Sequence, residues 1–201
     1  MPDLFKEKAK EWDVNEMVKK LSSAIGSCII DNVSLNETMH VMDFGAGTGL
    51  ITSQVAPRVN KITAVDVSEA MLEQLLAKQE LEGKVEALCQ DITTQPTGVE
   101  YDLIMSAMAM HHVEDTENMV QQFAAHLKSG AKVALADLDK EDGSFHPPEA
   151  QGVYHSGFER EKFAALLEKN GFKDINIVTA HTVDKEDKSY PIFLALATKS
   201  V

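Results

Sequence analysis

The sequence predicts an α/β fold in which helices cover both faces of a doubly wound, mostly parallel sheet of about seven strands. Strand-like runs alternate with helical segments as far as residue 138, and this alternation places the crossovers on the two faces of a parallel sheet. Two strand-like runs then follow one another with no helix between them, and such neighbours form an antiparallel hairpin. We therefore expect one domain over residues 1–201, with one antiparallel strand supplied by a C-terminal hairpin.

Hydrophobic spacing and capping residues define the elements of the first half. In residues 3–31, apolar side chains recur three or four positions apart, as on one face of a helix. Further on, β-branched runs alternate with amphipathic ones, and Ser68 is suited to cap a helix. In order, we expect a helical segment over 1–31, a strand at His40–Phe44, a helix over 48–56, a strand at Lys61–Asp66, a helix over 69–81 and a strand at Val85–Cys89.

The same signals define the second half. Asp115 is suited to cap a helix, Gly130 to end it, and Ser156 with Glu159 forms a capping-box pattern. In order, we expect a strand at Tyr101–Ala107, a helix over 116–128, a strand at Ala131–Leu138, a helix over 159–169, and strands at Ile175–Val183 and Ile192–Thr198.

Composition and charge exclude several classes of protein. Apolar residues make up 44% and charged residues 25%, as in ordinary globular proteins. The 19 basic residues against 32 acidic ones give a net charge of −13, so we expect no nucleic-acid partner and no binding to a membrane surface. Cys28 and Cys89 are isolated, which predicts two buried thiols and neither a disulfide framework nor a zinc knuckle. With no long apolar run, we expect a cytoplasmic protein without a signal peptide or membrane span.

The strongest functional signal is a glycine loop between the first expected strand and the next helix. Val41-Met-Asp-Phe-Gly-Ala-Gly-Thr-Gly-Leu50 spaces its glycines at 45, 47 and 49. Glycines let a ligand approach the backbone closely, and a helix start offers free N–H groups. A dinucleotide fingerprint would have its third glycine where Leu50 stands, and no Gly-Lys-Ser/Thr of a P-loop follows. The spacing thus favours a bound ligand over a plain turn, and disfavours a dinucleotide or a P-loop nucleotide.

Two acids end the next two expected strands. Asp66 lies about 20 residues past the glycine loop, where a carboxylate binds a ribose diol in doubly wound sheets. Such a carboxylate can accept hydrogen bonds from both hydroxyls at once. Asp91 and Ile92 end the third strand, and this pair can receive an exocyclic amine while the aliphatic side chain packs on a purine. A helix-capping Asp66 is the alternative, but Ser68 is suited to that role.

The order of these motifs resembles the class I S-adenosylmethionine-dependent methyltransferases, and most of all the small-molecule group of ubiquinone and menaquinone biosynthesis. The motifs are Asp-x-Gly-x-Gly-x-Gly, then Val-Asp-x-Ser-x-x-Met-Leu, then Gln-Asp-Ile, then Tyr-Asp-Leu-Ile-Met-Ser followed by His-His-Val, within residues 40–138. The resemblance implies a Rossmann-like sheet with a reversed seventh strand and S-adenosylmethionine as cofactor. It does not identify the acceptor.

The resemblance also implies a role for each residue that matches a motif. For the methionine end of the cofactor these are Gly45, Ala46 and Gly47 beneath it, Asp43 and Gly49 shaping the loop, and the backbone of Ser106 and Ala107. For the nucleoside they are Asp66 on the ribose, Val67 and Met71 along the adenine, and Asp91 with Ile92 at the adenine amine.

The acceptor side is expected around the histidines that follow the fourth strand. His111 is the first candidate for a general base facing the acceptor, and His155 is the second. A metal site formed by His111 with His146, His155 and Asp137 is an alternative, but no ligand spacing supports it, and we expect no metal. The long segment 139–158 is rich in rings and suited to form a lid over the substrate.

We therefore interpret the sequence as an enzyme that transfers a methyl group to a small-molecule acceptor by in-line displacement. Two alternatives remain open. One is a protein that binds S-adenosylmethionine without catalysis, such as a regulatory partner. The other is a nucleotide-dependent oxidoreductase, which the missing third glycine disfavours.

Overall fold

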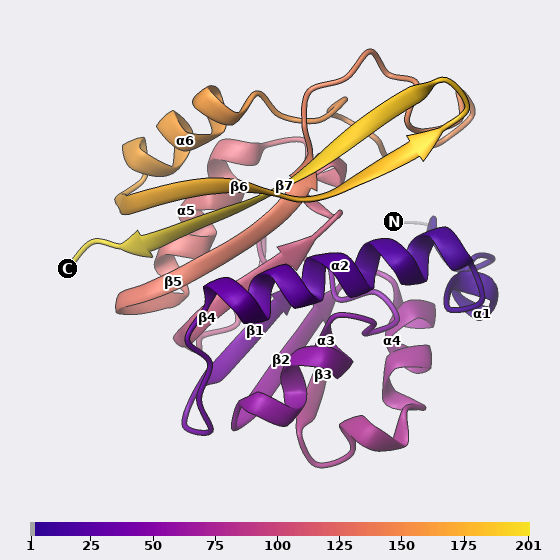
Figure 1. The fold of residues 1–201 in the computed structure, drawn as a ribbon. Coiled ribbons are helices and arrows are strands. Elements are labelled where there is room, and N and C mark those ends of the chain that lie inside the picture. Colours follow the sequence, from indigo (N-terminus) through magenta and orange to yellow (C-terminus); the bar gives the residue numbers. More distant parts are fainter. Residues whose placement is uncertain (1–2) are drawn as a thin grey trace.

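The computed structural model describes residues 3–201 and contains one mixed sheet with helices on both faces (Figure 1). The strands are β1 (His40–Phe44), β2 (Lys61–Asp66), β3 (Val85–Cys89), β4 (Tyr101–Ala107), β5 (Leu127–Leu138), β6 (Phe172–Lys185) and β7 (Lys188–Lys199). The helices are α1 (Ala9–Trp12), α2 (Glu16–Asn32), α3 (Thr52–Val55), α4 (Glu69–Leu76), α5 (Thr116–Ala125) and α6 (Arg160–Lys169). Three short 3-10 turns are η1 (Ala56–Arg58), η2 (Gln79–Leu81) and η3 (Met110–His112).

The seven strands lie in the order β3-β2-β1-β4-β5-β7-β6. The first five strands pair in parallel, and β7 pairs antiparallel with both β5 and β6. The predicted doubly wound sheet, with one reversed strand from a C-terminal hairpin, is therefore confirmed. The order reverses between β1 and β4, because the chain moves outward from β1 to β3 and then returns to the other side of β1. Ligands of doubly wound sheets bind at such a switch point.

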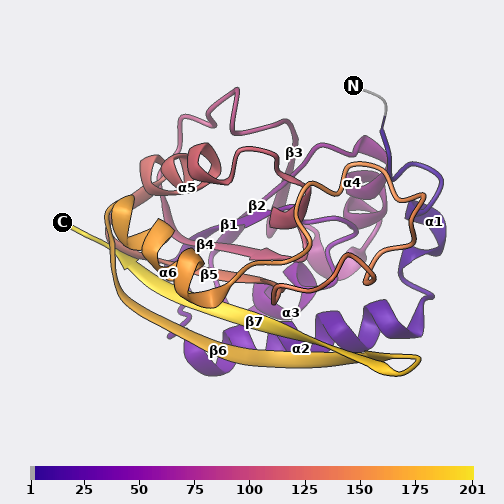
Figure 2. The same ribbon diagram turned by 90° about the horizontal axis from the view of Figure 1, so that it is seen from above.

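Alternating apolar side chains give the sheet two buried faces. On one face, α2, α3 and α4 pack through residues such as Ile25, Val55 and Leu75. On the other face, α5 and α6 pack through Phe123 and Leu167. Figure 2 shows these two layers of helices on opposite sides of the sheet. Within residues 3–201, no helix is both long and apolar enough to cross a membrane.

The helices of the first half are shorter than predicted. The expected single helical segment of 1–31 is broken before α2, where the Asn15 side chain accepts hydrogen bonds from the N–H groups of Met17 and Val18; Met1 and Pro2 lie outside the described residues. The helix expected over 48–56 begins only at Thr52, because the glycine loop continues as turns. The Ser68 cap is confirmed, but its helix ends at Leu76.

The second half also departs from prediction in its boundaries. Asp115 caps α5 as predicted, but β5 begins at Leu127, and Gly130 lies within the strand at a break in its pairing with β4. Glu159 precedes α6 without a side-chain cap, so the predicted capping box with Ser156 is wrong. Cys89 is exposed and Cys28 half-buried, contrary to the expectation of two buried thiols.

The segment 139–158 is a long loop whose two ends are joined by backbone hydrogen bonds. The N–H of Phe158 donates to the carbonyl of Leu138, and the N–H of Lys140 donates to the carbonyl of Phe158. Gly157 allows this approach: it has φ +68°, and a Cβ there would lie 2.1 Å from the carbonyl oxygen of Asp139. The loop is therefore attached firmly where β5 ends.

We predict that Gly157→Ala destabilises the protein more than Gly130→Ala. Both glycines have positive φ, so an L side chain at either position costs about 1–2 kcal/mol. A Cβ at Gly130 meets nothing within 4 Å, whereas at Gly157 it collides with backbone, which adds about 1–3 kcal/mol. Urea denaturation of both variants measures the difference. Equal losses of unfolding free energy would show that the backbone around Asp139 shifts easily to make room for the Cβ at position 157.

Candidate functional site

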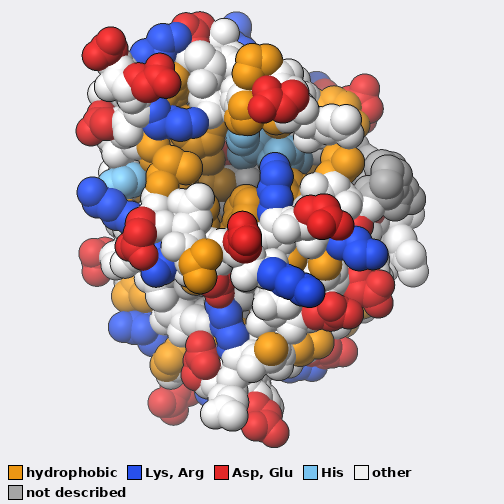
Figure 3. All heavy atoms as spheres, turned by 90° about the vertical axis from the view of Figure 1, so that its right-hand side faces the viewer, with side chains coloured by type: hydrophobic (Ala, Val, Ile, Leu, Met, Phe, Trp, Pro, Cys, Tyr) orange, Lys and Arg blue, Asp and Glu red, His pale blue; other side chains and the backbone are white. Residues whose placement is uncertain are grey.

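The carboxyl ends of the parallel strands bring the predicted site residues to one edge of the sheet. Phe44 of β1 is level with Val65 of β2 and with Ser106 of β4, and Ala107 is level with Ala136 of β5. The segments that follow these residues therefore meet. Figure 3 shows a hollow on the face of the molecule at this end, with hydrophobic side chains within it and histidines along its edge.

The glycine loop has the conformation that its sequence predicts. Gly45, Gly47 and Gly49 have φ values of +69°, +54° and +80°, which L side chains rarely adopt. A Cβ at Gly45 would lie 2.2 Å from the Cβ of Ala109, and one at Gly49 would lie 2.8 Å from Leu75. A Cβ at Gly47 would meet nothing within 4 Å. Two glycines thus serve packing, and Gly47 faces open space.

Asp66 links the glycine loop to the start of α4. One carboxylate oxygen accepts a hydrogen bond from the N–H of Gly47 at 2.8 Å, and the other accepts one from the N–H of Ser68 at 2.8 Å. Burial raises the pKa of Asp66, and the backbone hydrogen bonds oppose this rise. Asp66 therefore holds the turn after β2, and its remaining lone pairs lie beside the open space at Gly47.

Asp43 is buried beneath the same loop. It accepts a hydrogen bond from the hydroxyl of Thr52 on α3. Burial raises its pKa to about 7, the nearby Asp66 adds to the rise, and the bond from Thr52 opposes it. This arrangement links β1 to α3 and so supports the glycine loop from below.

The residues expected around the nucleoside differ in their exposure to solvent. Val67 is 63% exposed next to Asp66, whereas Met71 and Ile92 are buried. Asp91 accepts hydrogen bonds from the N–H and hydroxyl of Thr93, so one of its oxygens closes a turn. Val67 is thus the apolar group most accessible to a ligand at this edge.

Ser106 and Ala107 end β4 beside the glycine loop. The Ser106 side chain is buried and donates a hydrogen bond to the carbonyl of Phe44 at 2.9 Å. This bond ties β4 to β1 at the switch point. The Ser106 hydroxyl is therefore engaged within the sheet.

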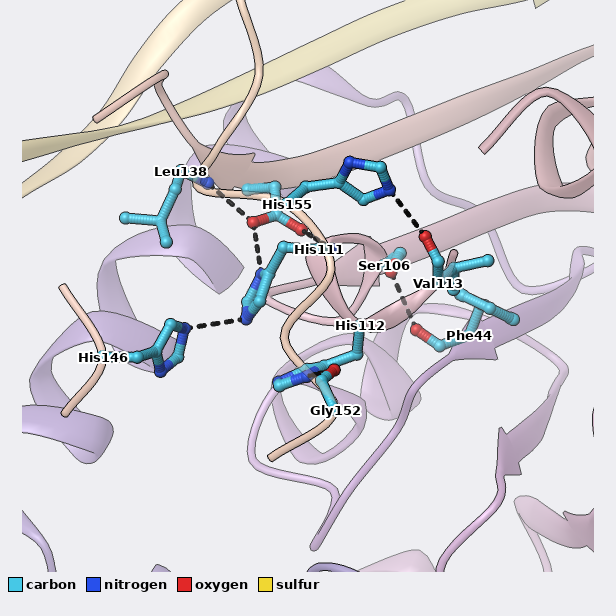
Figure 4. A network of polar contacts seen from close by, with 10 residues as sticks. Phe44, Ser106, His111, His112, Val113, Leu138, His146, Gly152 and His155 are labelled. Atoms are coloured by element: carbon cyan, nitrogen blue, oxygen red, sulfur yellow. Dashed lines mark hydrogen bonds and ion pairs between the residues drawn. The ribbon is translucent and has the colours of Figure 1, made fainter. Parts of the chain in front are cut away.

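His111 forms a buried pair with Asp137, which lies near the end of β5. Its Nδ1 atom lies 2.6 Å from one oxygen of Asp137, and its backbone N–H donates to the other at 3.1 Å. The ring is 1% exposed and the carboxylate 0%. Asp137 thus holds His111 at the carboxyl ends of the strands, and Figure 4 shows the ring with a polar contact on each of its two nitrogens.

Two further imidazoles lie against this pair. The Nε2 atom of His146 is 3.1 Å from Nε2 of His111, and the His112 ring centre is 4.2 Å from that of His111. Burial, reinforced by the neighbouring His111, lowers the pKa of both His112 and His146 to about 4. Both rings are therefore neutral at physiological pH.

His155 does not join this cluster. Its Nε2 atom lies 2.9 Å from the carbonyl oxygen of Val113 and 3.2 Å from that of Glu114, and its ring packs on Phe158. Figure 4 shows the ring turned away from His111 toward Val113. The geometry gives His155 a place in holding the loop, and brings His146 to the position beside His111 instead.

The loop 139–158 and the N-terminal segment cover this edge from two sides. The N–H groups of Tyr154 and His155 both donate to the carbonyl of His111, and the carbonyl of Gly152 accepts from the His112 ring at 2.7 Å. The Phe5 ring packs edge-on against His112, with centres 5.4 Å apart. Figure 2 shows both segments at the same end of the sheet.

Sequence reasoning missed two features of this site. The first is the contact of Asp137 and His146 with His111, which the sequence suggested only as an alternative metal site. Across residues 3–201, no group of three or more acids, histidines or cysteines is arranged to hold a metal ion. A buried acid interrupting the apolar run Val133–Leu138 was the available signal. The second feature is the hydrogen bond from Thr48 to Asp13, which joins the glycine loop to the N-terminal segment. No pattern in the sequence indicates this contact.

Comparison with known proteins agrees with this geometry. Residues 41–130 match a family described as a methyltransferase domain. An uncharacterized methyltransferase of Schizosaccharomyces pombe is 27% identical over 173 residues, which are 78% of this chain and 59% of that protein. A ubiquinone biosynthesis O-methyltransferase of Coxiella burnetii is 30% identical over 105 residues, 50% of this chain and 44% of that protein. The chain thus spans about half the length of these relatives.

Solved structures share the fold. The N-methyltransferase NodS of Bradyrhizobium japonicum, in complex with S-adenosylhomocysteine, matches with a TM-score of 0.74 at 14% identity, over 98% of this chain and 94% of that one. A methyltransferase in complex with the Trm112 activator of Haloferax volcanii matches with a TM-score of 0.80 at 14% identity, over the whole of both chains. The matched domain, the sheet order and the glycine loop are the features that this chain shares with class I S-adenosylmethionine-dependent methyltransferases.

We predict that Asp43→Asn makes the protein less sensitive to rising pH. The pKa of Asp43 is about 7 in the folded chain and near 3.8 when unfolded, so the folded chain holds a proton that the unfolded chain has lost between pH 4 and 7. Stability therefore falls as pH rises through this window, by roughly 4 kcal/mol at most. Asparagine cannot ionise, so the variant gains stability relative to the wild type from pH 4 to pH 8.

Urea denaturation at the two pH values measures this gain. Identical pH dependence in the variant and the wild type would show that Asp43 ionises in the folded chain as freely as in the unfolded one.

Proposed function

We propose that this protein transfers the methyl group of S-adenosylmethionine to a small-molecule acceptor by in-line displacement. The observation that carries this proposal is the open space at Gly47 beside the partly buried carboxylate of Asp66, at the switch point of the sheet. A ligand there lies against the glycine backbone on one side and meets, on the other, a carboxylate that can accept hydrogen bonds from a diol. The match of residues 41–130 to a methyltransferase domain makes S-adenosylmethionine the ligand to test first.

The residues at this edge fit the cofactor. Gly45 to Gly49 would run beneath its methionine end, and the lone pairs of Asp66 would accept hydrogen bonds from the ribose hydroxyls. Val67, exposed beside Asp66, offers an apolar surface to adenine, and Asp91 has one oxygen that does not close the Thr93 turn. These residues, which we call the cofactor cradle, thus offer a complementary group to each part of S-adenosylmethionine.

The protein's chemical task is mainly positional. When bound, the cofactor supplies a methyl group already activated by a sulfonium. The chain must hold a nucleophile about 3 Å from that carbon, in line with the leaving sulfur, and keep water away. The loop 139–158 and the Phe5 side chain lie where they can exclude water, and His111 is the group placed to receive a proton.

Three observations support a small acceptor. The net charge of −13 disfavours a polyanionic substrate, and two segments of the chain already cover the acceptor side. The named relatives include an O-methyltransferase of ubiquinone biosynthesis and an N-methyltransferase. We place this chemistry in the cytoplasm.

We predict that Asp66→Ala and His111→Ala separate cofactor binding from methyl transfer. Removing a carboxylate that accepts ribose hydrogen bonds costs about 1.5–3 kcal/mol, so affinity for S-adenosylhomocysteine falls roughly 10- to 150-fold in Asp66→Ala. His111 faces the acceptor, so His111→Ala keeps that affinity within about threefold while methyl transfer falls about 10²- to 10⁴-fold.

Calorimetry with S-adenosylhomocysteine measures both affinities before any acceptor is known. Asp66→Asn, which keeps one acceptor oxygen, is the control for collapse of the turn and should lose less affinity than Asp66→Ala. Equal losses in the Asp66 and His111 variants would contradict the division of the site into a cofactor side and an acceptor side.

The decisive test of the function uses labelled S-adenosylmethionine with a small-molecule extract. We expect label to enter compounds of low molecular mass, and calorimetry to show binding of the cofactor but not of NAD. Binding without any turnover would favour the non-catalytic regulatory protein, and binding of NAD alone would favour the oxidoreductase.

A further inference from the structure

Asp137 is a fully buried acid that the cofactor cradle does not use. One oxygen accepts hydrogen bonds from Nδ1–H of His111 at 2.6 Å and from the N–H of Leu138 at 2.7 Å. The other oxygen accepts the backbone N–H of His111 at 3.1 Å. Burial of a carboxylate is unfavourable unless hydrogen bonds compensate it. The hydrogen bonds of Asp137 all come from His111 and from the strand end beside it.

The contacts determine where the ring protons lie. A carboxylate only accepts hydrogen bonds, so Nδ1 of His111 must carry a proton. The neutral ring then has its lone pair on Nε2, which faces Nε2 of His146 at 3.1 Å, so His146 must be the donor in this contact. His111 thus presents the lone pair of Nε2, and His146 of the loop donates a hydrogen bond to it.

Two other features point to proton transfer. His146 lines a cavity of about 600 Å³ between the loop 139–158 and the β6–β7 hairpin, so its ring can exchange protons with solvent. Beyond Asp137, the charged and titratable groups around the rings are Lys185 of β6, which faces His146, and Lys8, which faces His112. Both are cations, so within residues 3–201 the carboxylate in contact with His111 is that of Asp137.

We propose that Asp137 is a positioning residue that fixes the Nδ1–H tautomer of His111, that His146 passes the proton to solvent, and that the acceptor is a hydroxyl or phenol. This inference rests on the proposed function. A phenol with a pKa near 10, and still more an alcohol, loses its proton only as the new bond forms and so needs a base at that moment. A neutral amine attacks through its lone pair without one, and a thiol ionises near pH 8.5 by itself.

The step balances as follows. The acceptor oxygen forms a bond to the methyl carbon, the carbon–sulfur bond breaks, and its electron pair stays on sulfur. The hydroxyl, having taken the place of His146 at Nε2 of His111, gives its proton to that nitrogen. Asp137 stabilises the imidazolium. While it is displaced, the His146 ring exchanges protons with the adjacent cavity until its proton is on Nδ1 and its lone pair on Nε2. On returning, it accepts the proton of His111 at Nε2 and releases the Nδ1 proton into the cavity.

The test of Asp137 is a measurement of the His111 tautomer in the free protein. Nitrogen-15 NMR of the imidazoles should show His111 as the Nδ1–H form in the wild type, and a mixture of tautomers in Asp137→Asn. Asp102→Asn is the matched control, since Asp102 accepts a backbone N–H and a lysine at the opposite edge of the sheet. An unchanged tautomer in Asp137→Asn overturns the positioning role, whatever the function.

The kinetic arm separates base positioning from folding. We expect Asp137→Asn to lower kcat about 10²- to 10⁴-fold while calorimetry shows unchanged affinity for S-adenosylhomocysteine. His146→Gln keeps a donor to His111 but cannot carry a proton, so it should be as slow as His146→Ala. Full activity of His146→Gln would overturn the relay and would show that His146 serves only as a hydrogen-bond donor to His111.

The acceptor class has its own readout. With a carbon-13-labelled methyl group and a small-molecule extract, the NMR shift of the product distinguishes an O-methyl from an N-methyl group. An O-methyl product is expected, and an N-methyl or S-methyl product overturns the acceptor assignment. Failure of the wild type to bind S-adenosylhomocysteine would instead overturn the proposed function, while the tautomer measurement would still decide the role of Asp137.

Discussion

The parallel register of β1, β2, β4 and β5 is the constraint on which the rest of the structure depends. Because these strands run in one direction and in step, their carboxyl ends reach one edge together, and every loop that carries chemistry starts there. The glycine loop, the turn at Asp66, the histidines of η3 and the loop 139–158 are consequences of that alignment. A slip of register in one strand would separate the cofactor side from the acceptor side.

Two buried acids and one partly buried acid lie at this edge, and each is held by a different set of donors. Asp43 receives a hydroxyl from α3, Asp66 receives two backbone N–H groups, and Asp137 receives two backbone N–H groups and an imidazole. Burial opposes their charge, and hydrogen bonds support it. These donors fix each of the three carboxyl groups at the carboxyl ends of the strands.

The N-terminal segment and the loop 139–158 are both attached through contacts with residues of the site. Asp13 takes the hydroxyl of Thr48 in the glycine loop and pairs with Lys78, so the N-terminal segment is attached to the cofactor side. The loop 139–158 is attached to the acceptor side through the carbonyl of His111. Phe5 reaches across to the His112 ring and joins the two. Opening either side therefore requires the loss of contacts made by site residues.

The sequence by itself determined the order of elements, the reversed strand and the cofactor motifs, because hydrophobic period, capping and glycine spacing are local properties of the chain. Helix ends such as those at Asn15 and Leu76 were missed, since nearby contacts and turns end helices as much as propensity does. Only the tertiary structure decided which groups meet His111. Asp137 and His146 lie 26 and 35 residues away in the chain, and no spacing rule predicts such a contact. The sheet register and the closed base of the loop bring these residues together, and these are properties of the folded chain alone.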